Sequence, residues 1–180
     1  MTQFSDDMET YYRIDRNYQI VDVGGAWDDF AISNGSDECV SKYVIGDNLR
    51  NHITGDVIWM WFEALVTGVF VSGKTVERDY RCDAPYARRL FKLTCVLEAP
   101  ETICFTHKLI SEEAMDTTVA ISTPTRLSNT TPRCSICNSV YLDGEWQDPF
   151  SLNRDLMLQA TYTMCESCRD ADADLSARSA

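Results

Sequence analysis

Alternating apolar and polar positions near the start of the chain predict two short strands. They cover residues 11–15 and 18–23 and flank a tight turn at Arg16-Asn17. Gly24-Gly25 ends the second run. The simplest interpretation is a β-hairpin.

The next periodic segments predict helices. Trp27, Phe30 and Ala31 share one face of a helix that begins near residue 26, and short helical or turn segments are expected over residues 39–53. Residues 56–71 predict a longer helix, whose apolar stripe is flanked on both sides by further apolar side chains: Ile58, Phe62, Leu65 and Val69 in the stripe, with Trp59, Trp61, Val66 and Phe70 beside it. So wide an apolar arc implies a second packing surface. Either another part of the chain or a second subunit covers it.

Three strands are predicted to follow, over residues 75–83, 89–97 and 102–110. A symmetric register about Ala99-Pro100 would place Cys95 opposite Cys104, but it would also mix apolar with polar faces, so an offset of one residue is favoured. The two cysteines should then lie on opposite faces. The expected inner face comprises Val76, Tyr80, Cys82, Phe91, Leu93, Cys95, Leu97, Ile103, Phe105, His107 and Leu109, with Arg78 on the same parity.

Two matched cysteine pairs give the chain its strongest chemical motif. Cys134 and Cys137 form one C-x2-C, and Cys165 and Cys168 form the other. Two such pairs can supply four thiolates to one tetrahedral Zn2+, and a site closed by four sulfurs serves structure and not catalysis. A disulfide and a redox C-x-x-C are the alternatives.

Composition divides the chain into parts. We expect a first domain at residues 8–112, a Thr-rich linker at 113–132, a small zinc-ribbon-like module at 133–170 and a disordered tail at 171–180. The module has few large apolar side chains and should depend on its metal for folding.

The charge of the chain bears on its partners. The net charge is -12, and residues 133–180 carry 4 basic and 8 acidic side chains, a net of -4. Nucleic-acid binding needs a basic surface, so a nucleic-acid-binding, transcription-associated regulator is only an alternative. The start of the chain has no secretory pattern, and residues 57–71 are too short an apolar run for a membrane helix. We therefore expect a cytoplasmic protein without a membrane partner.

The order of these elements resembles that of a PAS domain. Tyr12-Arg13-Ile14-Asp15, Trp27-Asp28-Asp29-Phe30-Ala31, Gly46 and the stretch from Arg81 to Arg89 are similar to a group of bacterial PAS-like proteins that end in a zinc-ribbon-like tail. Asn138 stands where such tails commonly have a basic residue, and Tyr162-Thr163 where they have His-Gly. The resemblance implies an α+β fold with a five-stranded antiparallel sheet and helices over one face. It also implies a sensing or protein-interaction role, and it names no organic ligand.

A pocket in such a domain would lie over the inner face of the sheet. An imidazole among apolar side chains could bind a small ligand, or could simply be a satisfied core residue. The candidate pocket residues are His107, Phe105, Phe91, Leu93, Tyr80 and Arg78, and for Arg78 an edge charge that reaches water is the alternative. A haem sensor that uses His107 or His52 is a further alternative.

The remaining candidates concern partners and reactivity. A homodimer or a signalling partner would contact Trp59, Val66 and Phe70 or the basic cluster Arg81, Arg88 and Arg89. For the cluster, neutralisation by Asp79 and Asp83 is the alternative. A redox switch among Cys39, Cys82, Cys95 and Cys104 competes with their role as small buried hydrophobes. No enzymatic motif is found, and a Cys–His nucleophile has no support, so we expect no enzymatic activity.

Overall fold

The computed structural model describes residues 8–98, 101–122 and 130–171. The expected turn at Ala99-Pro100, residues 123–129 of the expected linker and all but the first residue of the expected tail lie outside these ranges. Within them, the chain forms two five-stranded sheets, of which the first is packed against helices.

The first sheet begins with the predicted hairpin. β1 (Glu9–Ile14) pairs antiparallel with β2 (Ile20–Gly25). The turn between them is wider than predicted: Tyr18 has a φ of 61°, and Asp15 Oδ1 accepts hydrogen bonds from the backbone N–H groups of Asn17 and Gln19. The second strand therefore starts at Ile20 and not at Tyr18, because a left-handed residue cannot continue a strand.

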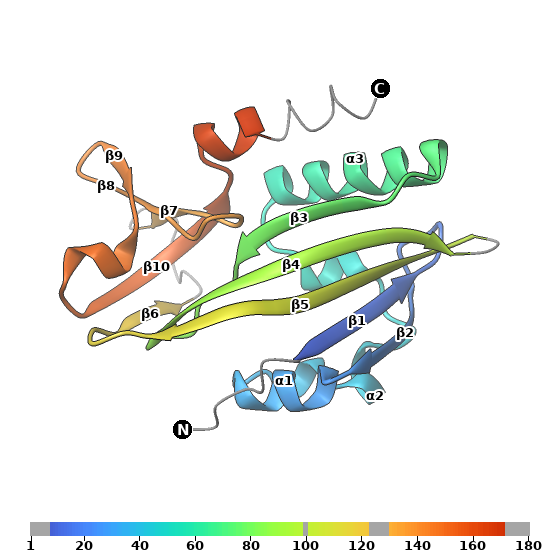
Figure 1. Cartoon of the computed structure of the whole chain (residues 1–180), viewed down its shortest axis with the longest axis horizontal. Coiled ribbons are helices and arrows are strands. Elements are labelled where there is room, and N and C mark those ends of the chain that lie inside the picture. Colours follow the sequence, from blue (N-terminus) through green and yellow to red (C-terminus); the bar gives the residue numbers. More distant parts are fainter. Residues whose placement is uncertain (1–7, 99–100, 123–129, 172–180) are drawn as a thin grey trace.

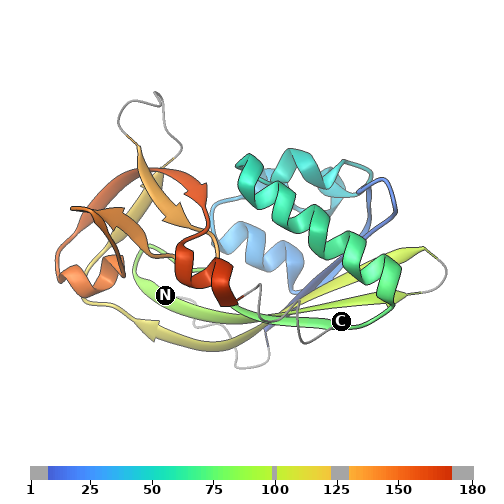
Figure 2. The ribbon, with the colours of Figure 1, turned by 90° about the horizontal axis from the view of Figure 1, so that it is seen from above.

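Helices follow the hairpin in the predicted order. They are α1 (Trp27–Ser33), η1 (Asp37–Cys39), α2 (Ser41–Val44), η2 (Leu49–His52) and the long α3 (Asp56–Ser72). Figure 2 shows α1 and α3 over the same face of the first sheet. Gly73 ends α3 in the left-handed conformation, with its N–H bonded to the Val69 carbonyl.

The remaining strands of this sheet are β3 (Val76–Arg81), β4 (Ala87–Glu98) and β5 (Thr102–Ala114), which complete the order β2-β1-β5-β4-β3 (Figure 1). The offset register is confirmed: Cys95 faces Phe105, and Cys104 faces Val96. Cys95 lies in the main core, while Cys104 is on the other face near Thr106. The predicted sheet of five antiparallel strands with helices over one face is therefore present.

The second sheet contains more of the chain than the expected module. Its order is β6-β10-β7-β8-β9, from β6 (Val119–Ser122), β7 (Thr131–Cys134), β8 (Val140–Leu142), β9 (Glu145–Gln147) and β10 (Leu156–Thr163). A turn of 3-10 helix, η4 (Pro149–Leu152), precedes β10, and residues 166–171 are helical. β10 pairs parallel with both β6 and β7. Segments assigned to the linker thus form strands, because β10 supplies hydrogen-bond partners from far along the chain.

The two sheets are packed against each other through α3 and β3. Trp61 of α3 and Tyr80 of β3 pack against the buried cluster of Cys134, Ile136, Met164 and Cys165. At the start of α3, a Cβ added to Gly55 would lie 2.9 Å from the Tyr162 carbonyl oxygen of β10, so this close approach requires glycine. On the Trp61 side, the second apolar surface of the long helix is covered by the chain itself.

None of the helices within the described residues is long and apolar enough to cross a membrane.

Candidate metal centre and ligand cavity

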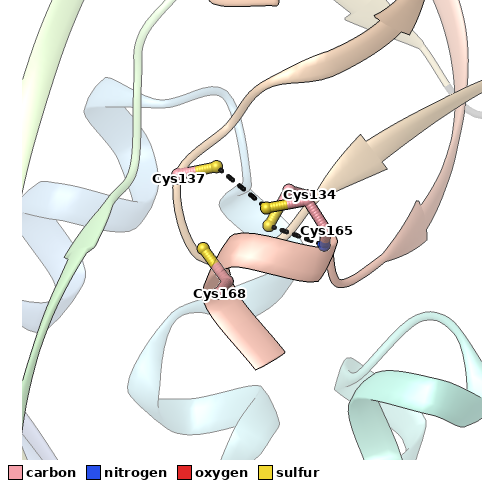
Figure 3. Close-up of side chains that lie close together, drawn as sticks. All are labelled: Cys134, Cys137, Cys165 and Cys168. Carbon is pink, nitrogen blue, oxygen red and sulfur yellow. Dashed lines mark hydrogen bonds between the residues drawn. The ribbon is translucent and has the colours of Figure 1, made fainter. Parts of the chain in front are cut away.

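The four cysteines of the two C-x2-C pairs converge on one point. Their sulfur atoms all lie within 4.8 Å of one another, and Cys137 Sγ is 3.8 Å from Cys165 Sγ (Figure 3). A tetrahedral zinc ion with Zn–S bonds of about 2.3 Å needs sulfurs about 3.8 Å apart. The donor set and its spacing therefore fit a four-sulfur metal site.

Local backbone structure holds each pair in place. Cys134 is the last residue of β7, and Cys137 lies on the turn that follows, in which the Asn138 N–H donates to the Cys134 carbonyl at 3.0 Å. Asn138 has a φ of 60°, a conformation that asparagine tolerates better than most residues. This accounts for Asn138 at a position where a basic residue was expected from the resemblance. The Cys165 N–H donates to Cys134 Sγ at 3.4 Å, and this bond ties the second pair to the first.

Neighbouring sulfurs change the pKa values of Cys134, Cys137 and Cys168. A shared hydrogen bond between Cys134 and Cys137 raises the pKa of the Cys134 thiol and lowers that of Cys137. Burial, followed by the hydrogen bond to Cys165, raises the pKa of Cys168 to about 12. Without a cation these sulfurs cannot all be thiolates at neutral pH, whereas a divalent metal stabilises the ionised form.

Arg78 lies beside this cluster and not in a ligand pocket. Its guanidinium donates to the Cys168 carbonyl at 3.4 Å and lies 5.5 Å from the centroid of the Trp61 ring. Burial lowers the pKa of Arg78, and the neighbouring cysteine sulfurs oppose this shift. The expected pocket role and the edge-charge alternative are both corrected, because β3 carries Arg78 to the contact between the two sheets.

The arginines of the basic cluster, Arg81, Arg88 and Arg89, also form contacts within the chain. Asp148, just before η4, accepts hydrogen bonds from Arg81 Nη1 at 2.8 Å and from Arg88 Nη2 at 3.0 Å. One carboxylate of the second unit, the part of the chain built on the second sheet, therefore binds two arginines of the first unit, the part built on the first sheet. Arg81 also pairs with Asp83. Arg89 is only 2 % exposed and donates to the Cys82 carbonyl and to Asn34 Oδ1. The expected docking surface at these arginines is therefore wrong for Arg89, and the chain's own carboxylates engage Arg81 and Arg88.

The α3 residues of the expected interaction surface, Trp59, Val66 and Phe70, also contact other parts of the chain. Val66 is 2 % exposed and belongs to the core, which corrects its assignment to a surface. Trp59 makes an edge contact with Tyr18 at 4.9 Å and lies under the Arg50 guanidinium, and Phe70 lies under that of Arg16. Side chains from the first turn and from η2 thus cover this flank of α3.

We expect Asp148→Asn to destabilise the contact between the units by about 1–3 kcal/mol, because it leaves two arginines without their shared carboxylate. Burial acts to raise the pKa of Asp148, but hydrogen bonds from Arg81 and attraction to Arg88 hold it below its ordinary value. A lowered pKa stabilises the fold above the unfolded-state value of about 3.9, and this contribution is lost as the pH falls through the folded value. Urea unfolding at pH 6 and pH 8 should therefore give the same loss.

The control is Glu145→Gln, an exposed carboxylate on β9 of the same unit. Its unfolding free energy should match that of the parent within about 0.5 kcal/mol. An Asp148→Asn loss no greater than that of the control would contradict the bridging role.

A cavity of about 270 Å³ lies between the first sheet and the helices α1 and η2. Of the predicted pocket residues, Tyr80, Phe91 and His107 line it, whereas Phe105 and Leu93 belong to the main core. The further lining residues come mainly from β1 and the helical segments: Thr10, Tyr12, Ile20, Trp27, Phe30, Ala31, Asn34, Ser36, Cys39, Val44, Leu49, His52 and Cys82. The alternation of the first hairpin could have indicated Thr10 and Tyr12, since it places both on the core face.

His107 lines the cavity from β5, the central strand of the first sheet. Its Nδ1 is 2.7 Å from the Tyr80 hydroxyl, and its ring is stacked on Tyr12 with centroids 5.5 Å apart. Burial lowers the pKa of His107 to about 4, so the imidazole is neutral at pH 7. His52 also lines the cavity, with its Nε2 3.0 Å from Asp47 Oδ2.

The other four cysteines, Cys39, Cys82, Cys95 and Cys104, are free thiols. Cys39 and Cys82 line the cavity, and burial raises the pKa of both thiols. Burial also raises the pKa of Cys95, to about 12, and that of Cys104. Each is therefore mainly a protonated thiol at neutral pH, which fits small buried hydrophobes better than a redox switch.

Comparisons with known proteins give a limited result. No protein-family model matches the chain, and no curated protein matches it significantly. The PAS domain of the RpfR quorum-sensing receptor from Cronobacter turicensis, solved in complex with C12:0, is 16 % identical, with a TM-score of 0.45 over 62 % of this chain and 100 % of that one. The same domain in complex with BDSF gives 16 % identity and a TM-score of 0.44 over the same shares. A likeness of this degree says nothing about this chain's ligand. The strand order and the helices on one face already define the first unit as PAS-like in fold.

Proposed function

We propose that the chain is a non-enzymatic sensory module, in which a PAS-like unit binds a small molecule and a zinc-stabilised unit passes the signal to a protein partner or a second subunit. The observation that carries this proposal is the cavity of about 270 Å³, lined mainly by apolar and aromatic side chains with a few polar groups. Concave, mainly apolar sites with a few polar groups are typical of small-molecule binding. A cytoplasmic location remains part of the proposal.

One strand would connect the cavity with the metal site. Tyr80 of β3 lines the cavity and also packs against the cysteine cluster. The next residue, Arg81, donates its N–H to the Ile136 carbonyl at 2.7 Å, between the two cysteines of the first pair. A ligand that displaces Tyr80 would therefore act on the backbone turn that holds Cys134 and Cys137. Coupling of this kind is reciprocal, so metal binding should also change ligand affinity.

The metal would have a structural role. Four sulfur ligands leave no open coordination position, and the buried cluster around Cys134 and Cys165 is small. We propose Zn2+ because its tetrahedral geometry matches the sulfur spacing and because thiolates favour it. The ion would hold the β7 turn, the last helix and, through Ile136, the end of β3.

The test is a native mass spectrum of the purified, untagged chain and of Ala31→Leu. Ala31 lines the cavity from α1 and is 6 % exposed, so the larger side chain should fill part of the space. We expect the parent to carry one zinc per chain and a small organic ligand, and the variant to keep the zinc and lose the ligand. Ile32→Leu, on the exposed side of the same helix, is the control and should keep both. A parent that neither copurifies with a small molecule nor binds small aromatic probes in its cavity would overturn the sensory proposal.

A further inference from the structure

Four polar side chains of the cavity, Thr10, Tyr12, Tyr80 and His107, lie together on the sheet. Thr10 of β1 is directly opposite His107 of β5, and Tyr12 lies two residues along the same strand. All three line the cavity, and Tyr80 joins them through its hydrogen bond to His107. The rest of the wall is mostly apolar or aromatic, with Asn34, Ser36 and His52 as the polar side chains of the helical segments, so the sheet offers a ligand the larger group of polar contacts.

The hydrogen bond with Tyr80 determines which ring nitrogen of His107 carries the proton. Within the described residues, the Tyr80 hydroxyl has no side-chain partner other than Nδ1. A buried hydroxyl that found no acceptor would be costly, so Tyr80 donates and Nδ1 accepts. A neutral imidazole then carries its proton on Nε2, which is left as a hydrogen-bond donor.

Two donors in this cluster have no acceptor among the residues that the structure describes. They are Nε2–H of His107 and the hydroxyl of Tyr12, whose ring is stacked on Phe105 and makes an edge contact with Trp27. Burial raises the pKa of Tyr12, so its hydroxyl keeps its proton. The cavity thus presents two uncharged donors to whatever occupies it.

Among the residues that the structure describes, no Lys, Arg, Asp or Glu lines the cavity. Arg89 lies behind the wall, where Asn34 and the Cys82 carbonyl accept its hydrogen bonds. His52 is paired with Asp47, which is not a lining residue. A charged ligand would lose its hydration here without meeting an opposite charge in the wall.

We propose, on the basis of the sensory function above, that the cavity selects small, uncharged, largely apolar molecules that carry a hydrogen-bond acceptor, such as aromatic ketones, and that Tyr12 and His107 bind the acceptor. An apolar cavity of about 150 Å³ is large enough to bind benzene, so the volume of about 270 Å³ leaves room for a substituted ring. The aromatic side chains around it, among them Trp27 and Phe91, offer faces and edges against which such a ring packs.

Three isosteric probes separate charge from hydrogen bonding. Acetophenone carries a carbonyl acceptor, α-methylstyrene replaces that oxygen with a methylene, and benzoate carries a negative charge. The dissociation constants are measured by amide chemical-shift titration of the zinc-loaded full chain. The constant for acetophenone should be about five- to tenfold lower than that for α-methylstyrene, because a neutral hydrogen bond contributes about 1 kcal/mol. Benzoate should bind more weakly than both.

Variants test which side chains bind the acceptor atom of the ligand. Tyr12→Phe removes only a hydroxyl, and it should reduce the preference for acetophenone over α-methylstyrene to about twofold or less, with α-methylstyrene affinity unchanged. His107→Phe should have the same effect if it folds. Tyr11→Phe, the neighbouring residue on the opposite face of β1, is the control and should keep the full preference.

The outcomes distinguish the two proposals. If none of the three probes shifts the amides of the lining residues, the sensory function fails. If α-methylstyrene or benzoate binds as tightly as acetophenone, or if Tyr12→Phe and His107→Phe both keep the preference, the cavity is a ligand site but the inferred ligand class is wrong.

Discussion

Cys168→Ser should lose the metal and unfold the part of the chain around the cysteine cluster. Structural zinc sites contribute about 10–16 kcal/mol of apparent binding free energy in small peptides, and that energy is folding energy. Mutation of a residue that only hydrogen-bonds to a metal ligand already lowers metal affinity about 10–100-fold. The loss of one of the four ligands themselves should therefore lower it about a hundredfold or more. Zinc content by mass spectrometry and backbone amide spectra of residues 131–171 would measure both effects.

Cys104→Ser is the matched control for this experiment. Cys104 lies on the outer face of the first sheet near Thr106, far in the fold from the four-sulfur cluster, so a serine there should leave zinc content unchanged. Retention of stoichiometric zinc by Cys168→Ser would overturn the metal centre. Absence of zinc from the reduced parent would do the same and would revive the disulfide and redox alternatives.

The second large effect is expected at Phe105, which the sequence assigned to a ligand pocket. Its side chain is fully buried, stacked on Tyr12 with centroids 4.8 Å apart and on Phe62 at 5.1 Å. Phe105→Ala should therefore destabilise the chain by about 3–5 kcal/mol, the usual cost of removing a packed aromatic side chain from a core. Denaturant unfolding of the zinc-loaded chain measures it.

Thr106→Ala serves as the comparison, because Thr106 is the next residue on the same strand and points to the other face. Its free energy of unfolding should stay within about 0.5 kcal/mol of the parent. A Phe105→Ala loss below about 1 kcal/mol would mean that this side chain does not hold the helices on the sheet.

Much of the first unit was predictable because local pattern and local packing agree. Alternation at residues 76–109 assigned Phe91, Leu93 and Phe105 to the buried face, and burial of one face then required the offset register. The spacing of Ile58, Phe62, Leu65 and Val69 gave the long helix almost to the residue.

The burial and the hydrogen-bond partners of polar side chains were not predictable from the sequence pattern. Arg89 looked like part of an exposed basic cluster, yet it is buried against the Cys82 carbonyl and Asn34, because β4 turns it inward near α1. Arg81 and Arg88 are bound by Asp148, which lies 60 or more residues away along the chain. Such partners depend on how the two units pack, and no local rule contains that information.

The sequence by itself indicated the four sulfur donors, because the same C-x2-C spacing occurs twice. It also determined the order of strands and helices in the first unit, because amphipathic periodicity is a local property. Only the tertiary structure decided which side chains line the cavity and that the cavity and the cysteine cluster share β3. It also decided that β6 joins β10 in a second sheet, because these contacts join segments distant in sequence whose pairing is selected by the packing of the whole chain.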